Sequence, residues 1–188
     1  MSEIEERLRH DGNRSKVIGF VDDLKELWAK AGKKGEIVRN APLSKELAFP
    51  RITYRVLKRV KNTDFKDIKP RHRTTIDHPY EPDAKVDLFG QIFSVYVEFA
   101  VYSTNQTEAD MLLDELEDFI ELYKGNFMTR GVQQVTFIEQ GEDKMLETGR
   151  LQIAVRELVY EFRLEKIVPK SIGDIKQIDL VGTSVRYI

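Results

Sequence analysis

The strongest constraint on the fold is a strict alternation of side chains between Gln91 and Tyr102. Bulky apolar residues occupy every odd position from 93 to 101, namely Phe93, Val95, Val97, Phe99 and Val101. Polar residues such as Ser94 and Glu98 fall at even positions, on the other side of an extended chain. A period of two is the repeat of a β-strand, and β-branched and aromatic residues are typical of strands. The sequence therefore predicts a long strand here, with a bend or bulge at Gly90.

Two segments carry the repeat of an amphipathic helix instead. Residues 13–32 place apolar side chains three or four positions apart, and Gly32 follows as a stop signal. The second helix is predicted to begin after Asn105, which forms a capping box with Glu108, and to run to Gly125. Its apolar face consists of Ala109, Leu112, Leu113, Leu116, Phe119, Ile120 and Tyr123. We expect both helices to pack on a sheet.

Three further strands are predicted, over residues 51–60, 132–139 and 151–167. The first loses its alternation at Leu57 and Lys58. In the second, Val135 and Phe137 are expected to face the core, and a polar hairpin link through residues 141–149 leads to the third strand.

The last of these strands changes phase along its length. Its apolar positions are odd as far as Val155 and even from Leu158 onwards. A regular pleat would turn one of these two sets towards solvent. A β-bulge or sharp bend is therefore predicted at Arg156–Glu157.

Three segments lack a clear element. Residues 36–50 are predicted to be a connector, and residues 61–84, which contain three prolines, are predicted to be an extended arm, with a short extended segment over 71–78 as an option. Residues 168–188 are predicted to be a C-terminal extension with one or two short strands. The fold class is thus α+β: a mainly antiparallel sheet of about four long strands packed by two amphipathic helices, with the arm and a C-terminal β tail.

Composition narrows the classes of function. The 188 residues match one domain, predicted to span residues 1–188. The absence of cysteine excludes disulfides, thiolate zinc sites, iron–sulfur clusters and a cysteine nucleophile. A net charge of -2 argues against a dedicated nucleic-acid binder. The charged amino end is unlike a secretory signal, and no apolar run approaches the ~18 residues that span a bilayer, so no membrane association is expected.

Catalytic motifs are missing from the sequence. It contains no HExxH, GxSxG, GxGxxG or GxxxxGK[ST] pattern. His72 and His78, with Asp77 and Asp83 nearby, allow a two-histidine, one-carboxylate metal site in principle. Exposed loop histidines are the simpler interpretation. We therefore predict no catalytic, cofactor-binding or metal-binding residue and no enzymatic activity, and an enzyme on a small α+β scaffold stays an alternative.

Charged residues are segregated along the chain. Residues 51–73 contain nine basic and two acidic side chains, and residues 106–124 contain seven acidic and one basic. Two solvated faces of one domain would explain this pattern. The basic segment could instead contact nucleic-acid phosphates. A third interpretation is that the basic patch of one subunit meets the acidic patch of the next, which would steer assembly and set its register. The candidate inter-subunit contacts are Arg55, Arg59, Arg71, Arg73, Asp114, Glu117, Asp118 and Glu121.

The order of elements resembles a known family. The passage from Ile92–Tyr102 through Ser103-Thr104-Asn105-Gln106-Thr107-Glu108-Ala109-Asp110-Met111-Leu112 resembles the strand-to-helix passage of bacteriophage tail terminator proteins, also called tail completion or neck proteins. The segment from Gly131-Val132-Gln133-Gln134-Val135, through a polar turn, to Arg156-Glu157-Leu158-Val159-Tyr160-Glu161-Phe162 is similar to the two antiparallel strands that finish that domain. The likeness covers about residues 49–167.

The resemblance implies a structural protein of the virion. Such proteins form a homo-oligomeric ring, typically a hexamer, that caps the tail tube and joins the tail to the head. The implied partners are the tail tube protein, the sheath protein where a sheath is present, and head–tail connector or neck proteins. DNA passes through the ring without being read, and the protein is assembled in the host cytoplasm into the tail and neck of the virion. The alternative function is a nucleic-acid-binding α+β module that uses the basic 51–73 segment.

Overall fold

The computed structural model describes residues 17–40, 48–64, 69–78, 85–148 and 151–171. Within these ranges the fold is α+β, with two helices and a mixed, mostly antiparallel sheet of seven strands, which confirms the predicted class. The elements in chain order are α2 (Val17–Lys30), β1 (Glu36–Arg39), β2 (Arg51–Lys61), β3 (Arg71–Asp77), β4 (Lys85–Ser103), α3 (Gln106–Thr129), β5 (Val132–Gln140), β6 (Lys144–Thr148) and β7 (Leu151–Ser171). The sequence predicted about four long strands.

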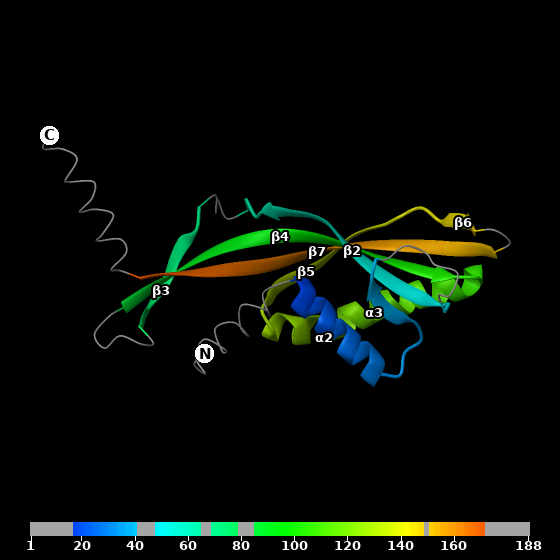
Figure 1. Cartoon of the computed structure of the whole chain (residues 1–188), viewed down its shortest axis with the longest axis horizontal. Helices are drawn as coiled ribbons and strands as arrows, with labels where there is room; N and C mark the ends of the chain where they lie inside the picture. The colour runs from blue at the N-terminus through cyan, green and yellow to red at the C-terminus, as the bar shows by residue number, and fades with distance from the viewer. Residues whose placement is uncertain (1–16, 41–47, 65–68, 79–84, 149–150, 172–188) are drawn as a thin grey trace, which may run out of the picture.

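The centre of the sheet is the antiparallel pair of β4 and β7. Their register runs from Val86 opposite Ser171 to Ser103 opposite Ala154 without a shift. On the outer side of β4, β2 and β3 follow one another, and on the outer side of β7, β5 and β6 do the same. The short β1 adds the parallel pair of the sheet, next to β2. Figure 1 shows the β4–β7 pair running along the whole described molecule.

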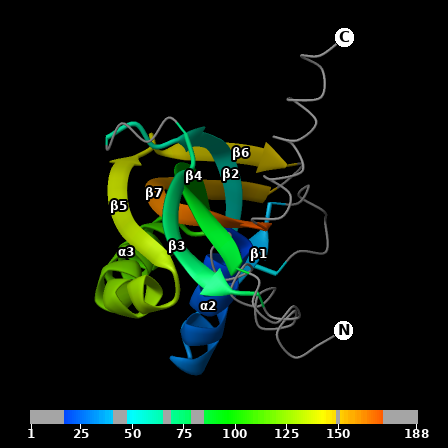
Figure 2. The ribbon, with the colours of Figure 1, turned by 90° about the vertical axis from the view of Figure 1, so that its left-hand side faces the viewer.

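Both helices lie on one face of the sheet, as the side view in Figure 2 shows. The odd positions of β4 and the even positions of β7, among them Phe99, Tyr160 and Phe162, form the main core with the apolar faces of α2 and α3. The helices cover only part of the length of the β4–β7 pair. The part that carries β3 projects beyond them (Figure 1); we call this part, made of β3, residues 85–90 and residues 165–171, the ribbon. Neither described helix has an apolar stretch long enough to cross a membrane.

Helix α3 begins at a side-chain cap and ends at a glycine turn. The Asn105 side chain accepts a hydrogen bond from the Glu108 backbone N–H, as the predicted capping box requires. The Glu108 carboxylate accepts a hydrogen bond from the Ser103 hydroxyl, 2.6 Å away. The prediction that the helix stops at Gly125 is wrong, because a helix passes through a glycine at modest cost and Phe127, two residues on, is fully buried. The chain turns only at Gly131, whose φ is 101°.

The segment predicted to be an extended arm contains a strand. Residues 71–77 form β3, which pairs with the first residues of β4, so β4 begins at Lys85 and not at Gln91. This strand matches the extended segment given as an option over residues 71–78. The sequence pattern did not establish it, because its side chains, apart from the half-buried Ile76, are exposed, and a strand without an apolar face has no alternation to detect. Residues 65–68 and 79–84 of the predicted arm lie outside the described residues.

The bulge predicted at Arg156–Glu157 is wrong. Here β7 stays in unbroken register with β4. The phase changes because this end of the sheet buries side chains on both faces. Ile153 and Val155 pack with Ala100 in a second, small cluster on the face without helices, whereas the even residues from Leu158 face the helices.

Other boundaries also differ from the predictions. Residues 36–39 of the predicted connector form β1. The broken alternation at Leu57 and Lys58 corresponds to a register shift between Val56 and Lys58. β7 continues to Ser171, so the first residues of the predicted C-terminal extension belong to the sheet. Residues 172–188, with the short strands predicted there, and residues 13–16 of the first helix lie outside the described residues.

Two leucines of α3 test this arrangement. Leu116 is fully buried under the helix, whereas Leu122 is 76% exposed. We expect Leu116→Ala to lower the free energy of unfolding by about 2–5 kcal/mol, because it removes apolar contacts and leaves a cavity. The matched Leu122→Ala variant should change it by less than about 0.5 kcal/mol. Urea unfolding followed by circular dichroism measures both; equal losses would contradict the assigned buried face.

Candidate assembly surfaces

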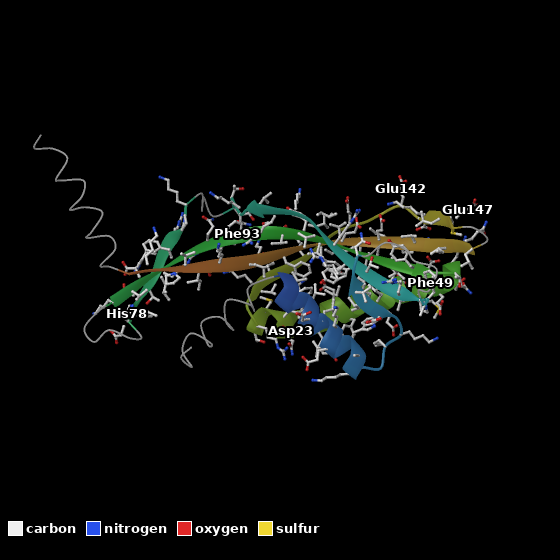
Figure 3. The ribbon with its side chains drawn as sticks, viewed as in Figure 1. Asp23, Phe49, His78, Phe93, Glu142 and Glu147 are labelled. Atoms are coloured by element: carbon white, nitrogen blue, oxygen red, sulfur yellow. The ribbon has the colours of Figure 1, made fainter. Side chains whose placement is uncertain are left out.

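The four arginines predicted as inter-subunit contacts lie on the same side of β4. Arg55 and Arg59 belong to β2, and Arg71 and Arg73 belong to β3. All four are exposed. In Figure 3, Phe93 marks the level at which β2 ends, and His78 marks the far end of the ribbon. The basic residues therefore extend from the middle of the sheet along the ribbon.

Arg55 and Arg73 already have carboxylate partners within the chain. Arg55 holds Glu98 with two hydrogen bonds, 2.5 Å from Nε to Oε1 and 2.8 Å from Nη2 to Oε2. Glu98 is only 8% exposed, and its hydrogen bond and charge raise the pKa of Arg55. Arg73 donates to Glu165 over 2.6 Å and so joins β3 to β7. Both arginines thus contribute to the fold.

Lys58 and Arg59 differ from Arg55 in their neighbours on β4, because they follow the register shift after Val56. The Lys58 ammonium lies 4.2 Å from the centre of the Tyr96 ring, and the Arg59 guanidinium lies 4.0 Å from the centre of the Phe93 ring. Such cation–π contacts are compatible with a further, anionic partner. Among the described residues, neither side chain forms an ion pair with a carboxylate.

The four predicted acidic contacts lie on α3, away from its buried face. Glu121 pairs with Lys124 at 3.2 Å. Within the described part of the chain, Asp114, Glu117 and Asp118 form no ion pair. Asp114 and Asp118 are exposed, and Glu117 is half-buried. This helix therefore presents uncompensated negative charge to its surroundings.

The field of these carboxylates extends into the core at Tyr160, which is fully buried beneath α3. Burial raises the pKa of its phenol, and the nearby charges of Glu117, Glu121 and Asp118 raise it further. The hydroxyl has no hydrogen-bond partner among the described residues. Tyr160 is therefore held as a neutral phenol.

An open groove follows the outer side of α3 and the loop after α2. Its volume is about 1150 Å³. Its lining includes Gly32, Lys33, Lys34, Pro50, Asn105, Glu108, Met111, Asp114, Glu115, Asp118, Leu122 and Tyr123. Lys33 and Glu115 form an ion pair across it, 2.6 Å from Nζ to Oε1. Four carboxylates and two lysines give the lining a net negative charge. The sequence pattern marked these acids but gave no signal for the groove, since α2 and α3 meet only in the folded chain.

The histidines do not come together with the carboxylates that suggested a metal site. His72 Nε2 lies 3.1 Å from Thr75 Oγ1 and 3.3 Å from Asp87 Oδ1. The hydrogen bond from Thr75, and then that with His72, lower the pKa of Asp87. His78 lies at the end of the ribbon (Figure 3), and Asp83 is outside the described residues. In the described ranges, no three His, Asp or Glu side chains gather closely enough to hold a metal ion.

Comparison with protein-family models finds no match for this chain, and comparison with curated proteins finds none either. The function of the chain is therefore inferred from the geometry of its described residues. That geometry offers two exposed surfaces of opposite charge: the basic end of β2 with the ribbon, and the acidic outer side of α3.

A comparison of Arg55 with Arg59, both on β2, should separate a role in folding from a role in assembly. Arg55→Ala leaves the buried Glu98 carboxylate without its partner, so we expect a loss of about 1–3 kcal/mol in the free energy of unfolding. Arg59→Ala removes only an exposed cation–π contact and should cost less than about 1 kcal/mol. Urea unfolding compares the two variants. A larger loss for Arg59→Ala would refute the assigned roles.

Tyr160 gives a prediction for alkaline pH. Its folded-state pKa lies above the unfolded value of about 10, so its contribution to stability is complete below pH 10 and is lost as the pH rises towards the folded-state pKa. We expect Tyr160→Phe to be at least as stable as the parent at pH 7, because no hydrogen bond within the described chain is lost. Between pH 10 and 11 the variant should lose less stability than the parent. Thermal melts at each pH measure this difference; identical pH profiles would contradict it.

Proposed function

We propose that this protein is a structural subunit of a homo-oligomeric ring, with the role of a phage tail terminator or a related neck protein. The observation that carries the proposal is the separation of unpaired charge. Lys58 and Arg59 at the end of β2, and Asp114, Glu117 and Asp118 on α3, have no ion-pair partner among the described residues. In Figure 1 the end of β2 lies above β4, and α3 lies below it.

Complementary surfaces on different parts of one subunit favour head-to-tail contact. When the basic surface of one copy meets the acidic surface of the next, the first copy keeps its acidic surface and the second keeps its basic surface for a further contact. Such a heterologous contact produces a closed ring if the rotation between neighbours closes. The proposed ring is a hexamer, as the resemblance to tail terminators implies.

The order of elements supports the more specific role. The long strand β4, the capped helix α3, and then β5 and β7, which pair antiparallel with the short β6 between them in the chain, come in the order of the passages that resemble tail terminators. In this role the ring caps the tail tube, stops its growth and offers a surface to the head–tail connector, with the sheath protein as a further neighbour in a contractile tail. DNA passes through the ring without sequence readout, and the protein resides in the tail and neck of the virion. The proposed role requires no catalytic group or cofactor.

Charge reversal tests the proposal. We expect light scattering behind a sizing column, and electron microscopy, to show rings of the parent protein, alone or on tail tubes. Arg59→Glu and Asp118→Lys should each weaken ring formation at least about tenfold, and the double variant should recover much of it, because the exchanged charges still attract. Assembly should also weaken as salt rises.

Glu142→Lys provides the matched control for these variants. Glu142 is exposed in the link between β5 and β6 (Figure 3), so its reversal should leave assembly unchanged. Failure to find rings of the parent protein, both alone and on tubes, would overturn the proposed function. Equal effects of all three reversals would show that total charge, and not the two surfaces, controls assembly.

The exposed run of Lys58, Arg59 and Lys61 on β2 also fits the phosphates of a nucleic acid, which is the second candidate function. Against it, Arg55 and Arg73 are already held by carboxylates. A mobility-shift assay with duplex DNA distinguishes the two functions. Tight binding at low salt that falls steeply with added salt, and that is lost in Arg59→Glu but retained in Asp118→Lys, would favour the nucleic-acid module.

A further inference from the structure

We propose that the end of β2, residues 57–61, of one copy occupies the groove beside α3 of the next copy. This inference rests on the proposed self-assembly and names the two surfaces that meet. It goes further than charge pairing, because both surfaces also expose apolar side chains.

The segment at the end of β2 combines apolar and basic residues. Leu57 and Val60 are each exposed by more than 40%, although they belong to a strand of the sheet. Lys58, Arg59 and Lys61 lie between and beside them. Beyond Tyr54, β1 no longer covers the outer edge of β2, so this end of the strand is accessible within the described part of the molecule. An occupant of this kind needs a groove that is both apolar and acidic.

The groove has that composition along one stripe of α3. Met111, Glu115, Asp118 and Leu122 recur every three or four residues and so share one face of the helix. Met111 is 68% exposed, and with Leu122 it ranks as the most exposed of the large apolar side chains of the described chain. The two are eleven residues apart, about 16 Å along a helix. Residues 57 and 61 of an extended strand lie about 13 Å apart, so the segment fits within this length.

The occupant has to come from another copy. Val60 pairs with Ser94, an even position of β4, and so lies on the face of the sheet that carries no helices, whereas the groove is lined by α3 and the loop after α2, which lie on the other face. Along the sheet, Ser94 is nine residues from the end of β4, about 30 Å, and Met111 is only about 9 Å from that end. The two positions in one chain are therefore separated by about 20 Å and by the sheet and helices between them.

Cysteine cross-linking tests the contact, because the parent chain has no cysteine. We would introduce Val60→Cys and Met111→Cys together and oxidise the protein at a concentration where light scattering detects oligomers. A disulfide requires Cα atoms within about 7 Å, so a link between these positions joins two copies. We expect a ladder of dimers, trimers and larger species on a non-reducing gel. Each single variant should yield dimers at most.

Matched controls keep the test specific. Leu146 on β6 is exposed to a similar degree as Val60, so Val60→Cys with Leu146→Cys should not produce the ladder. Adding Asp118→Lys to the Val60–Met111 pair should reduce it at least about tenfold. The mutated positions are exposed, and an unchanged melting temperature of the reduced protein verifies that each variant folds.

The outcomes separate this inference from the proposed function. Rings without the Val60–Met111 ladder, or with an equal ladder from Val60–Leu146, would overturn the docking contact and leave the ring intact. A ladder that a lysate protein suppresses by binding the groove would show that another partner is the preferred occupant, and would also overturn the inference. Absence of both rings and ladder would overturn the two proposals together.

Discussion

The antiparallel pairing of β4 with β7 is the interaction on which the rest of the structure depends. The two strands stay in one register from Val86 to Ser103, and every other strand except β1 pairs with one of them. β2 and β3 occupy one side of the pair, and β5 and β6 occupy the other. The odd side chains of β4 and the even side chains of β7 supply the sheet side of the core, so this register also decides what α2 and α3 can pack against.

Helices cover only part of this long pair, and the charged groups differ accordingly. Inside the covered part, two buried charges are paired within the chain: Arg156 donates to Asp110 over 2.6 Å, and Arg55 donates to Glu98. Lys58 and Arg59 on β2, and Asp114, Glu117 and Asp118 on α3, form no ion pair among the described residues. The chain thus pairs the buried Arg156 and Glu98 each with an internal partner and exposes charges of opposite sign on two other surfaces. This arrangement is the basis of the proposed ring.

The candidate site could be predicted in part. The basic residues form one continuous segment of the sequence and the acidic residues form another. Because the helical repeat of α3 is strong, the acidic face of that helix could be predicted. The partner of Arg55 could not be predicted, because Glu98 lies 43 positions away and contacts Arg55 only through the register of β2 with β4. The register shift after Val56 sets Arg59 over Phe93 and leaves it without a carboxylate partner among the described residues, although in sequence the two arginines look alike. The groove was equally hidden, since it forms between α3 and the loop after α2.

The sequence by itself determined the elements whose cause is local: the alternation of β4, the apolar faces of both helices, the Asn105 cap, and the stop at Gly32, whose φ is 64°. Only the tertiary structure decided what covers each face. The phase change in β7 looked like a bulge because periodicity reports which side chains share a side, but not whether the opposite side is also buried, as it is at Ile153 and Val155. β3 shows the converse case. Apart from the half-buried Ile76 its side chains are exposed, so it has no apolar period, and it forms because β4 provides an edge on which it can pair.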